Sequence, residues 1–145
     1  MSDYDPVVLA YVAGILDGEG TIGISMTKPN QGRVSPSFKI YCAVVMTDPI
    51  VPYMLYGMFG GSIHTYPGRQ EKHKATTHWR SSGKIAVKVC KCTLPYLKVK
   101  HQQAQLAIDF DKRIGNFTTR SMPPDELTER LRYVQQIHLL NKRGL

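Results

Sequence analysis

The chain is organised around one stretch, Val12-Ala13-Gly14-Ile15-Leu16-Asp17-Gly18-Glu19-Gly20. It ends an apolar run from Val7 in which apolar residues recur at spacings of three and four, the period of a helix. Residues 21–27 then alternate apolar and polar side chains, which predicts a strand. Two acids, Asp17 and Glu19, therefore lie among glycines where a buried helix gives way to a strand.

Small residues line one face of this helix. Ala10, Gly14 and Gly18 lie four apart, and this spacing lets two helix backbones approach closely. Glycine inside a helix costs roughly 1 kcal/mol relative to alanine, so two of them require an explanation. The pattern predicts that a second helix packs against this face.

The two acids lie at the C-terminal end of the helix, where the helix dipole disfavours negative charge. A divalent metal ion would compensate the charge of Asp17 and Glu19, because such ions prefer oxygen ligands. The alternative is a glycine C-cap followed by a surface turn, with both acids in solvent. Nine residues alone do not decide between these interpretations.

Length and composition predict a single domain, 1–145, that is large enough to bury a core. The longest apolar run has about ten residues, against roughly 20 for a membrane-spanning helix. The first residues lack the positive segment of a secretory signal. We therefore expect an intracellular protein, in the cytoplasm or an organelle matrix, with no membrane partner. The three cysteines fit a reducing interior, and Cys90-Lys91-Cys92 lacks the second ligand pair of a zinc finger.

The charge distribution favours a polyanion as partner. The chain has a net charge of +8 and a pI near 9.5. Residues 1–20 carry four acids and no Lys or Arg, whereas residues 61–103 carry nine Lys or Arg and one acid, Glu71. A charge run is often only a solvated face. Because this run is long and interleaved with His and Tyr, nucleic acid is the leading candidate partner.

The remaining periodicity predicts an α+β chain in which helices follow two pairs of strands. The strand 37–46 should run antiparallel to the first, with Lys39 and Tyr41 on its outer face. If Ile63 and Trp79 point inward, the next two strands present outward Ser62, His64, Tyr66, His78 and Arg80. The elements expected beyond residue 46 are a helix to about 58, strands 62–66 and 76–81, helices at about 83–93 and 98–112, and a last helix whose start signal spans 121–126.

The last two helices contain less regular features. Lys98 and Lys100 should occupy the first turn of the helix 98–112, where the dipole disfavours cations. Either they are exposed at a tolerated cost, or they and the free helix N–H groups face a phosphate. The final helix has a strong start signal at residues 121–126. Its expected apolar stripe consists of Leu127, Leu131, Val134, Ile137 and Leu140.

The stretch 12–20 resembles the motif of the LAGLIDADG homing endonucleases. Ala13, Gly14, Asp17 and Gly20 match the motif letter for letter, and the other positions carry conservative or common variants. Three later segments resemble family landmarks in the same order, and together with the motif they cover most of the chain. These are Phe59-Gly60-Gly61-Ser62-Ile63, the strand around Trp79, and Pro95-Tyr96-Leu97-Lys98-Val99-Lys100 followed by Gln103-Ala104.

The resemblance implies an α+β, αββαββαα LAGLIDADG fold whose four-stranded antiparallel saddle lies in the major groove of double-stranded DNA. A single motif implies a homodimer in which two motif helices pack through Ala10, Gly14 and Gly18. The implied activity is that of an intron-encoded, site-specific homing endonuclease. Such an enzyme makes a metal-dependent double-strand break in a long pseudo-palindromic target.

The motif also implies roles for individual residues. Glu19 matches the metal-binding acid, with the Gly18 carbonyl as a second ligand, and Asp17 matches a structural acid that helps the helix end. Lys100 matches the active-site lysine, so Glu19 and Lys100 are the implied catalytic residues. The implied cofactor is Mg²⁺, with Mn²⁺ as a substitute and Ca²⁺ supporting binding only. The implied DNA-binding residues are Ser25, Thr27, Lys28, Lys39, Tyr41, His64, Tyr66, Arg69, His78, Arg80 and Lys98.

One departure from the family pattern lies at the end of the second strand. Many relatives have a glutamine there, near the metal-bound water, where this chain has Met46-Thr47-Asp48. Thr47, Asp48 or an ordered water could take over that role. The alternative function is therefore a catalytically impaired DNA-binding regulator, or an RNA maturase, on the same fold.

Overall fold

The computed structural model describes residues 3–28, 36–115 and 122–142. Its elements are α1 (Pro6–Glu19), β1 (Gly20–Thr27), β2 (Ser37–Met46), α2 (Ile50–Phe59), β3 (Ser62–Tyr66), β4 (Thr76–Ser82), α3 (Lys84–Thr93), the 3-10 helix η1 (Leu94–Tyr96), α4 (His101–Ile114) and α5 (Pro124–Lys142). The expected α+β class is confirmed. Three α-helices follow the second strand pair in the described residues, one more than αββαββαα contains.

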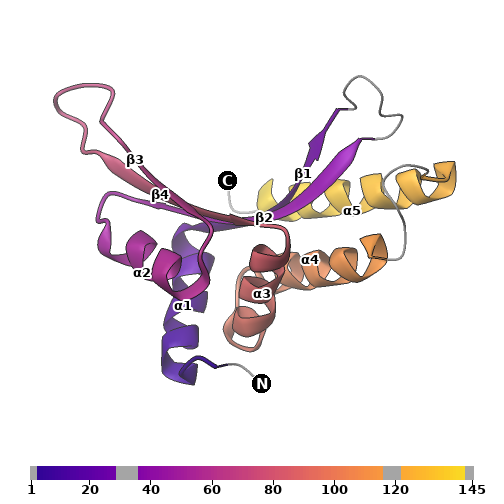
Figure 1. Cartoon of the computed structure of the whole chain (residues 1–145), viewed down its shortest axis with the longest axis horizontal. Helices are drawn as coiled ribbons and strands as arrows, with labels where there is room; N and C mark the ends of the chain where they lie inside the picture. Colours follow the sequence, from indigo (N-terminus) through magenta and orange to yellow (C-terminus); the bar gives the residue numbers. More distant parts are fainter. Residues whose placement is uncertain (1–2, 29–35, 116–121, 143–145) are drawn as a thin grey trace.

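The four strands form one antiparallel sheet in the order β1-β2-β4-β3. The strand pairs β1–β2 and β3–β4 therefore lie side by side, with β2 and β4 as the central strands. Figure 1 shows the two pairs rising at opposite sides of a curved sheet, with the helices gathered beneath it. No helix of the described residues covers the upper face, so the expected saddle is present.

The motif helix α1 begins and ends where the local sequence favours it. The Asp5 carboxylate accepts a hydrogen bond of 2.8 Å from the Val7 N–H, and Pro6 occupies the first helical position. At the other end, a Cβ added at Gly20 would lie 2.7 Å from the Cα of Leu16. Only glycine fits this sharp passage from helix to strand, which fixes the motif acids at the junction.

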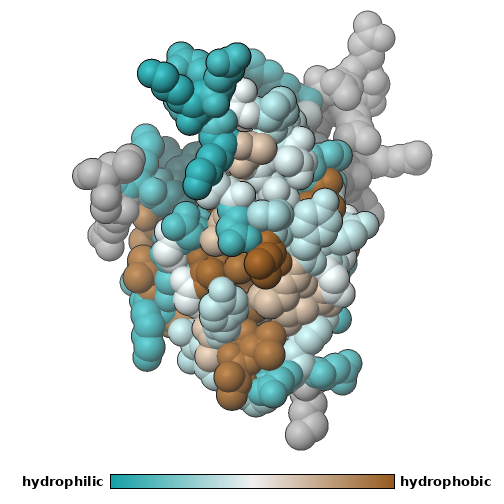
Figure 2. All heavy atoms as spheres, turned by 90° about the vertical axis from the view of Figure 1, so that its left-hand side faces the viewer, coloured by the Kyte–Doolittle hydropathy of each residue, from teal (hydrophilic) through white to brown (hydrophobic). Residues whose placement is uncertain are grey.

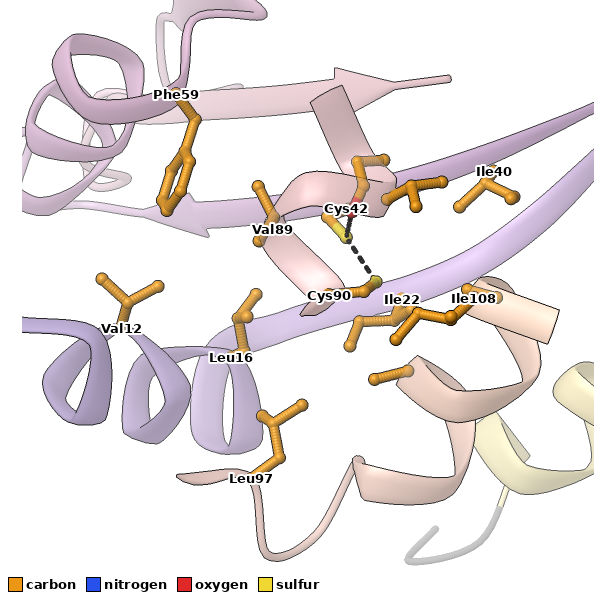
Figure 3. Close-up of a cluster of buried hydrophobic side chains, with 14 of the residues drawn as sticks. Val12, Leu16, Ile22, Ile40, Cys42, Phe59, Val89, Cys90, Leu97 and Ile108 are labelled. Carbon is orange, nitrogen blue, oxygen red and sulfur yellow. Dashed lines mark hydrogen bonds between the residues drawn. The ribbon is translucent and has the colours of Figure 1, made fainter. Parts of the chain in front are cut away.

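The core lies between the sheet and the helices, and Figure 3 shows part of it. Trp79 is fully buried and donates a hydrogen bond of 2.9 Å from Nε1 to the Gly60 carbonyl, so two sequence landmarks are in contact. The Sγ atoms of Cys42 and Cys90 lie 3.6 Å apart. The hydrogen bond between the two thiols and the burial of Cys42 raise the pKa of the Cys42 thiol well above its usual value. None of the described helices has the length and hydropathy that crossing a bilayer requires.

Two expectations about the last helices were wrong. α4 begins at His101, and residues 98–100 form a turn before it. In α5 the expected apolar stripe is confirmed at Val134 and Ile137, which are buried, but Leu131 is 39% exposed, whereas Glu126 and Arg130 are buried and form an ion pair of 3.0 Å. The buried pair of Glu126 and Arg130 therefore lies in the first turns of the helix, where only apolar side chains were expected to be buried. Part of the start signal, at 121, lies outside the described residues.

Candidate metal site and nucleic-acid interface

The last residue of α1 carries a carboxylate that the described residues do not engage. Glu19 is exposed and forms no hydrogen bond or ion pair with any of them. Gly18 is exposed beside it, and a Cβ added there would meet nothing within 4 Å. A carboxylate at the negative end of a helix dipole is a suitable ligand for a cation. No cluster of three or more His, Cys, Asp or Glu residues occurs in the described part of the chain.

The neighbouring acid is in a different environment. The Asp17 carboxylate accepts three backbone hydrogen bonds from the turn before α4, from the N–H groups of Lys98 at 2.9 Å, Val99 at 3.1 Å and Lys100 at 2.9 Å. Three N–H donors take up most of the hydrogen-bond acceptor positions of a carboxylate. Asp17 therefore joins the motif to a turn more than eighty residues away, rather than capping its own helix.

The same turn delivers Lys100 to the end of α1. The Lys100 Nζ donates a hydrogen bond of 2.7 Å to the backbone carbonyl of Asp17. Partial burial lowers the pKa of Lys100 below its ordinary value, and the negative charges of Asp17 and Glu19 oppose this shift. The structure thus brings Asp17, Glu19 and Lys100 together at one end of the motif helix.

The position of this turn overturns one interpretation of the two lysines. Neither Lys98 nor Lys100 lies in the first turn of a helix, because α4 starts only at His101. The N–H groups of residues 98–100 that were expected to face a phosphate bind Asp17 instead. The Lys98 side chain is exposed. A groove of about 840 Å³ lies beside this site, between the end of α1, the segment 97–103 and the end of α5.

The uncovered face of the sheet carries the polar side chains that strand alternation predicted. Ile22, Ile24, Ile40 and Trp79 are buried on the helix-covered side, so their neighbours along each strand point the other way. The expected DNA-binding residues on that uncovered side are Ser25, Thr27, Lys39, Tyr41, His64, Tyr66, His78 and Arg80. Lys28 and Arg69 are exposed in the segments that follow β1 and β3. The four strands contain no Asp or Glu, so the face is positively charged.

Two aromatic clusters give this face its shape. Across the central strands, the Arg80 guanidinium lies 4.2 Å from the centre of the Tyr41 ring. Towards the β3 edge, the Tyr66 and His78 rings are 4.6 Å apart in an edge-to-face arrangement, and the His64 ring is 6.3 Å from Tyr66. Such rings offer flat, sequence-tolerant contacts as well as hydrogen bonds, in addition to the positive charge.

The small-residue face of α1 is also open. Ala10, Gly14 and Gly18 are exposed, and a Cβ at either glycine would meet nothing within 4 Å. Large apolar side chains are also exposed on α1 and α2, including Val7 at 77% on α1 and Ile50 at 71% on α2. Figure 2 shows hydrophobic residues gathered on this side of the molecule, below a hydrophilic β3–β4 connection.

The segment that replaces the family glutamine has local structural roles. Met46 is half-buried and packs against the core. The Asp48 carboxylate accepts a hydrogen bond of 3.0 Å from the Ile50 N–H at the start of α2. Thr47 is exposed beside them. Met46 and Asp48 therefore have structural roles of their own, and neither supplies an amide like that of the glutamine.

Sequence reasoning missed the contacts that depend on distant segments. The bonds from Asp17 to the turn 98–100 had no local signal. The contact between Tyr41 and Arg80 had a weak one: Gly23 occupies an outward position of β1, and a glycine inside a strand often marks a close approach. The bridge in which the Asn141 side chain donates a hydrogen bond of 3.0 Å to the Ile22 carbonyl was also unforeseen.

Comparison with known proteins gives a consistent result at the level of structure only. No protein-family model matches the chain, and no curated protein sequence matches it. Solved structures do. The homing endonuclease I-CvuI, in complex with the I-CreI target and 2 mM Mg with the DNA not cleaved, has a TM-score of 0.75 and 20% identity over 96% of this chain and 84% of that chain.

Two further structures extend this result. The archaeal intron-encoded homing endonuclease I-Vdi141I, complexed with DNA, has a TM-score of 0.75 and 12% identity over 96% of this chain and 87% of that chain. The I-SmaMI LAGLIDADG homing endonuclease, bound to cleaved DNA, has a TM-score of 0.68 and 14% identity over 90% of this chain and 42% of that chain. The motif, the landmarks and these neighbours agree, and this chain has the LAGLIDADG homing endonuclease fold.

Proposed function

We propose that this protein is a site-specific, metal-dependent DNA endonuclease that acts as a homodimer on a long pseudo-palindromic target. The observation that carries the proposal is the unequal use of the two motif acids. Asp17 accepts hydrogen bonds from three N–H donors, whereas Glu19 is exposed and forms no hydrogen bond or ion pair with the described residues. This unengaged acid lies beside Lys100, at the end of a helix beneath a positively charged sheet.

The residues present fit a divalent metal ion of the Mg²⁺ type. The Glu19 carboxylate would hold it, with the exposed Gly18 carbonyl as a second oxygen ligand. When bound, such an ion lowers the pKa of a water ligand and neutralises charge on a scissile phosphate. Mn²⁺ has similar ligand preferences, whereas the looser coordination of Ca²⁺ suits binding without turnover.

Lys100 is the second catalytic residue in this proposal. Its ammonium is held by the Asp17 carbonyl at 2.7 Å, so its position is fixed before any substrate arrives. A preorganised cation at this point would stabilise the negative charge that develops on the phosphate in the transition state. No nucleophilic side chain is required, because water is the nucleophile in phosphodiester hydrolysis.

The proposed dimer uses the open face of α1. The space above Gly14 and Gly18 allows a second α1 to approach closely, and this would place two copies of Glu19 near a common centre. The exposed apolar side chains on α1 and α2 would be covered by the same contact. A two-fold dimer presents two equal saddles, which is why the expected target is pseudo-palindromic.

The test separates binding from cleavage. Duplexes are selected from a random library by the wild-type protein in Ca²⁺, Mg²⁺ is then added to wild type and Glu19→Gln in parallel, and cut ends are mapped. Paired cuts near the centre of a quasi-palindrome, absent in Glu19→Gln while its DNA affinity is retained, are expected. Cutting by Glu19→Gln at the wild-type rate would overturn the assignment of Glu19.

A second candidate function is favoured by the segment Met46-Thr47-Asp48. Met46 packs against the core, and the Asp48 carboxylate accepts a hydrogen bond from the Ile50 N–H, so neither presents an amide in place of the family glutamine. A regulator or maturase on the same fold would bind its nucleic acid without cutting. Tight, specific DNA binding with no cuts in Mg²⁺ supports a regulator, and competition by excess structured RNA supports a maturase.

A further inference from the structure

Three positions on three neighbouring strands form a stack across the uncovered face of the sheet. Gly23 on β1 pairs with Tyr41 on β2, and Arg80 on β4 pairs with Ala43, two residues further along β2. The Arg80 side chain crosses this diagonal and places its guanidinium 4.2 Å from the centre of the Tyr41 ring. The small side chain of Ala43 leaves room for that path.

Gly23 makes room for the ring. A Cβ added there would lie 2.6 Å from the Tyr41 hydroxyl oxygen and 2.7 Å from Cζ, distances that real Cβ atoms do not show. The phenol ring of Tyr41 therefore lies directly against the backbone of β1. Glycine inside a strand is otherwise unfavourable, because it has no side chain to pack and loses more backbone entropy. The glycine is explained if the ring must lie flat on the sheet.

The Arg80 side chain is supported on one face only. Its guanidinium forms no ion pair or hydrogen bond with any residue that the structure describes, and the four strands offer no carboxylate. The Ser62 hydroxyl contacts the Arg80 carbonyl at 3.4 Å and leaves the guanidinium untouched. Stacking on a ring restrains the guanidinium plane while its N–H edge stays available.

We propose that this stack is a guanine-reading site, in which the Tyr41 ring on Gly23 holds Arg80 ready to bind O6 and N7 of one guanine in each half of the target. The proposal rests on the proposed function, because it assumes that this face enters the major groove. An arginine fork matches the two acceptors of guanine in that groove, and no other base presents the same pair. β2 and β4, which carry Tyr41 and Arg80, are the central strands of the sheet, so the guanidinium lies in the middle of the face, and the ring reaches across to β1.

The alternative role for Arg80 is a phosphate contact. Phosphate contacts orient a protein on DNA and carry no sequence information, and any well-placed cation can make them. The stacked, two-pronged contact with O6 and N7 depends on the planar fork, so lysine at this position should read guanine less well than arginine. This difference makes Arg80→Lys the central variant, since it keeps the charge and removes the fork.

The experiment compares base preferences obtained by selecting bound duplexes from a random library in Ca²⁺, followed by sequencing. Wild type should prefer guanine at one position per half-site. Arg80→Lys should lose about tenfold to a hundredfold of this preference at that position only. Tyr41→Leu and Gly23→Ala, which remove or displace the ring, should weaken the preference at the same position. Tyr66→Leu removes another exposed aromatic residue of this face that does not contact Arg80. It is the matched control for this one position: it should leave the guanine preference there unchanged, whatever its effect on overall DNA affinity.

The outcomes are distinguishable. A uniform loss of affinity in Arg80→Lys, with base preferences unchanged, would identify a phosphate contact and overturn the inference. If the guanine preference falls in Arg80→Lys but not in Tyr41→Leu or Gly23→Ala, Arg80 reads the guanine without help from the Tyr41 ring, and the proposed role of the stack is wrong. Circular dichroism of each variant establishes that it is folded. If wild type selects no duplex at all, the proposed function fails, and this inference fails with it.

Discussion

The two motif acids show how strongly environment separates residues of the same chemistry. Asp17 and Glu19 are two positions apart at one helix end, yet three N–H groups bind the first and no described residue binds the second. Charge-assisted hydrogen bonds stabilise the Asp17 carboxylate and hold it in place. The acid suited to a cation is therefore the one that the fold leaves unengaged.

Asp17→Asn should weaken both stability and cleavage. The amide retains one acceptor oxygen and loses the charge, so the turn 98–100 loses much of its anchor. We expect a loss of about 1–3 kcal/mol in the free energy of unfolding, and a cleavage rate that falls more than DNA affinity does. Urea denaturation and single-turnover cleavage measure the two effects.

The control for this variant is Asp5→Asn. Asp5 also accepts a backbone hydrogen bond, from Val7 at the start of α1. Asparagine is as good an N-cap as aspartate, so stability should change by less than about 0.5 kcal/mol. Equal losses in the free energy of unfolding in the two variants would contradict a special role for the Asp17 carboxylate in holding the turn that carries Lys100.

The pH dependence of cleavage should identify Lys100. Burial lowers its pKa, so the ammonium is lost at a lower pH than that of a free lysine, and the rate should fall as pH rises through this value. Arginine remains charged at much higher pH. Lys100→Arg, if active, should therefore move the alkaline limb of the profile upward. An unchanged limb would mean that another group causes it.

At the scale of elements, sequence patterns located the strands well and the helix starts less well. Strands 37–46 and 62–66 were predicted to the residue, because alternation and glycine boundaries are local signals. The start of α4 was wrong because the N–H groups of residues 98–100 are satisfied by Asp17, a residue too distant in sequence to be recognised. Charge and position marked Asp17 and Glu19 as candidate metal ligands and Lys100 as a candidate phosphate contact. The choice of Glu19 over Asp17 and the catalytic role of Lys100 came from the family resemblance, and their contacts required the fold.

The buried pair in α5 leads to a prediction about stability. The Glu126 Oε1 atom accepts hydrogen bonds from Nε of Arg130 at 3.0 Å and from Nε of the partly exposed Arg113 at 3.2 Å. Glu126→Leu would leave Arg130 buried without its partner, at a cost of about 3–5 kcal/mol. Replacing Glu126 and Arg130 together by leucine should restore most of this loss. Urea denaturation midpoints of both variants measure the effect.

The control lies on the same helix. Glu129 pairs with Arg132 at 3.0 Å, but the Arg132 side chain is 61% exposed. Glu129→Leu should therefore change the free energy of unfolding by no more than about 1 kcal/mol. A similar loss at 126 and 129 would contradict the assignment of a buried network.

At the scale of the whole molecule, the fold separates three surfaces. The helices cover one face of the sheet, the other face is positively charged and uncovered, and α1 with α2 forms an apolar side (Figures 1 and 2). The proposed function assigns the uncovered face to DNA and the apolar side to a second copy. The site at the end of α1 lies where these two surfaces meet.

Gly14→Val should separate folding from dimer formation. A side chain at 14 meets nothing within 4 Å in one chain, and valine is no worse than glycine inside a helix. The monomer should therefore fold normally, whereas the dissociation constant of the dimer should rise by at least about tenfold, or about 1.4 kcal/mol. Analytical ultracentrifugation over a concentration series measures this constant.

Gln135→Val serves as the control, because position 135 is exposed on α5 rather than on the apolar side. It should leave the association state unchanged. If Gly14→Val also leaves it unchanged, α1 is not the dimer contact, and the proposed common centre for the two Glu19 side chains is lost.

The link between Asp17 and the turn 98–100 has a consequence for hydrogen exchange. Val99 is 70% exposed, and amide protons in such surface turns normally exchange with solvent within seconds or less. Here three consecutive amides are bound by one carboxylate from the other end of the chain. They should exchange slowly while the site is assembled and rapidly once α1 and the turn separate. Deuterium uptake at 98–100 therefore reports, without DNA or metal, how often Asp17 and the turn that carries Lys100 separate.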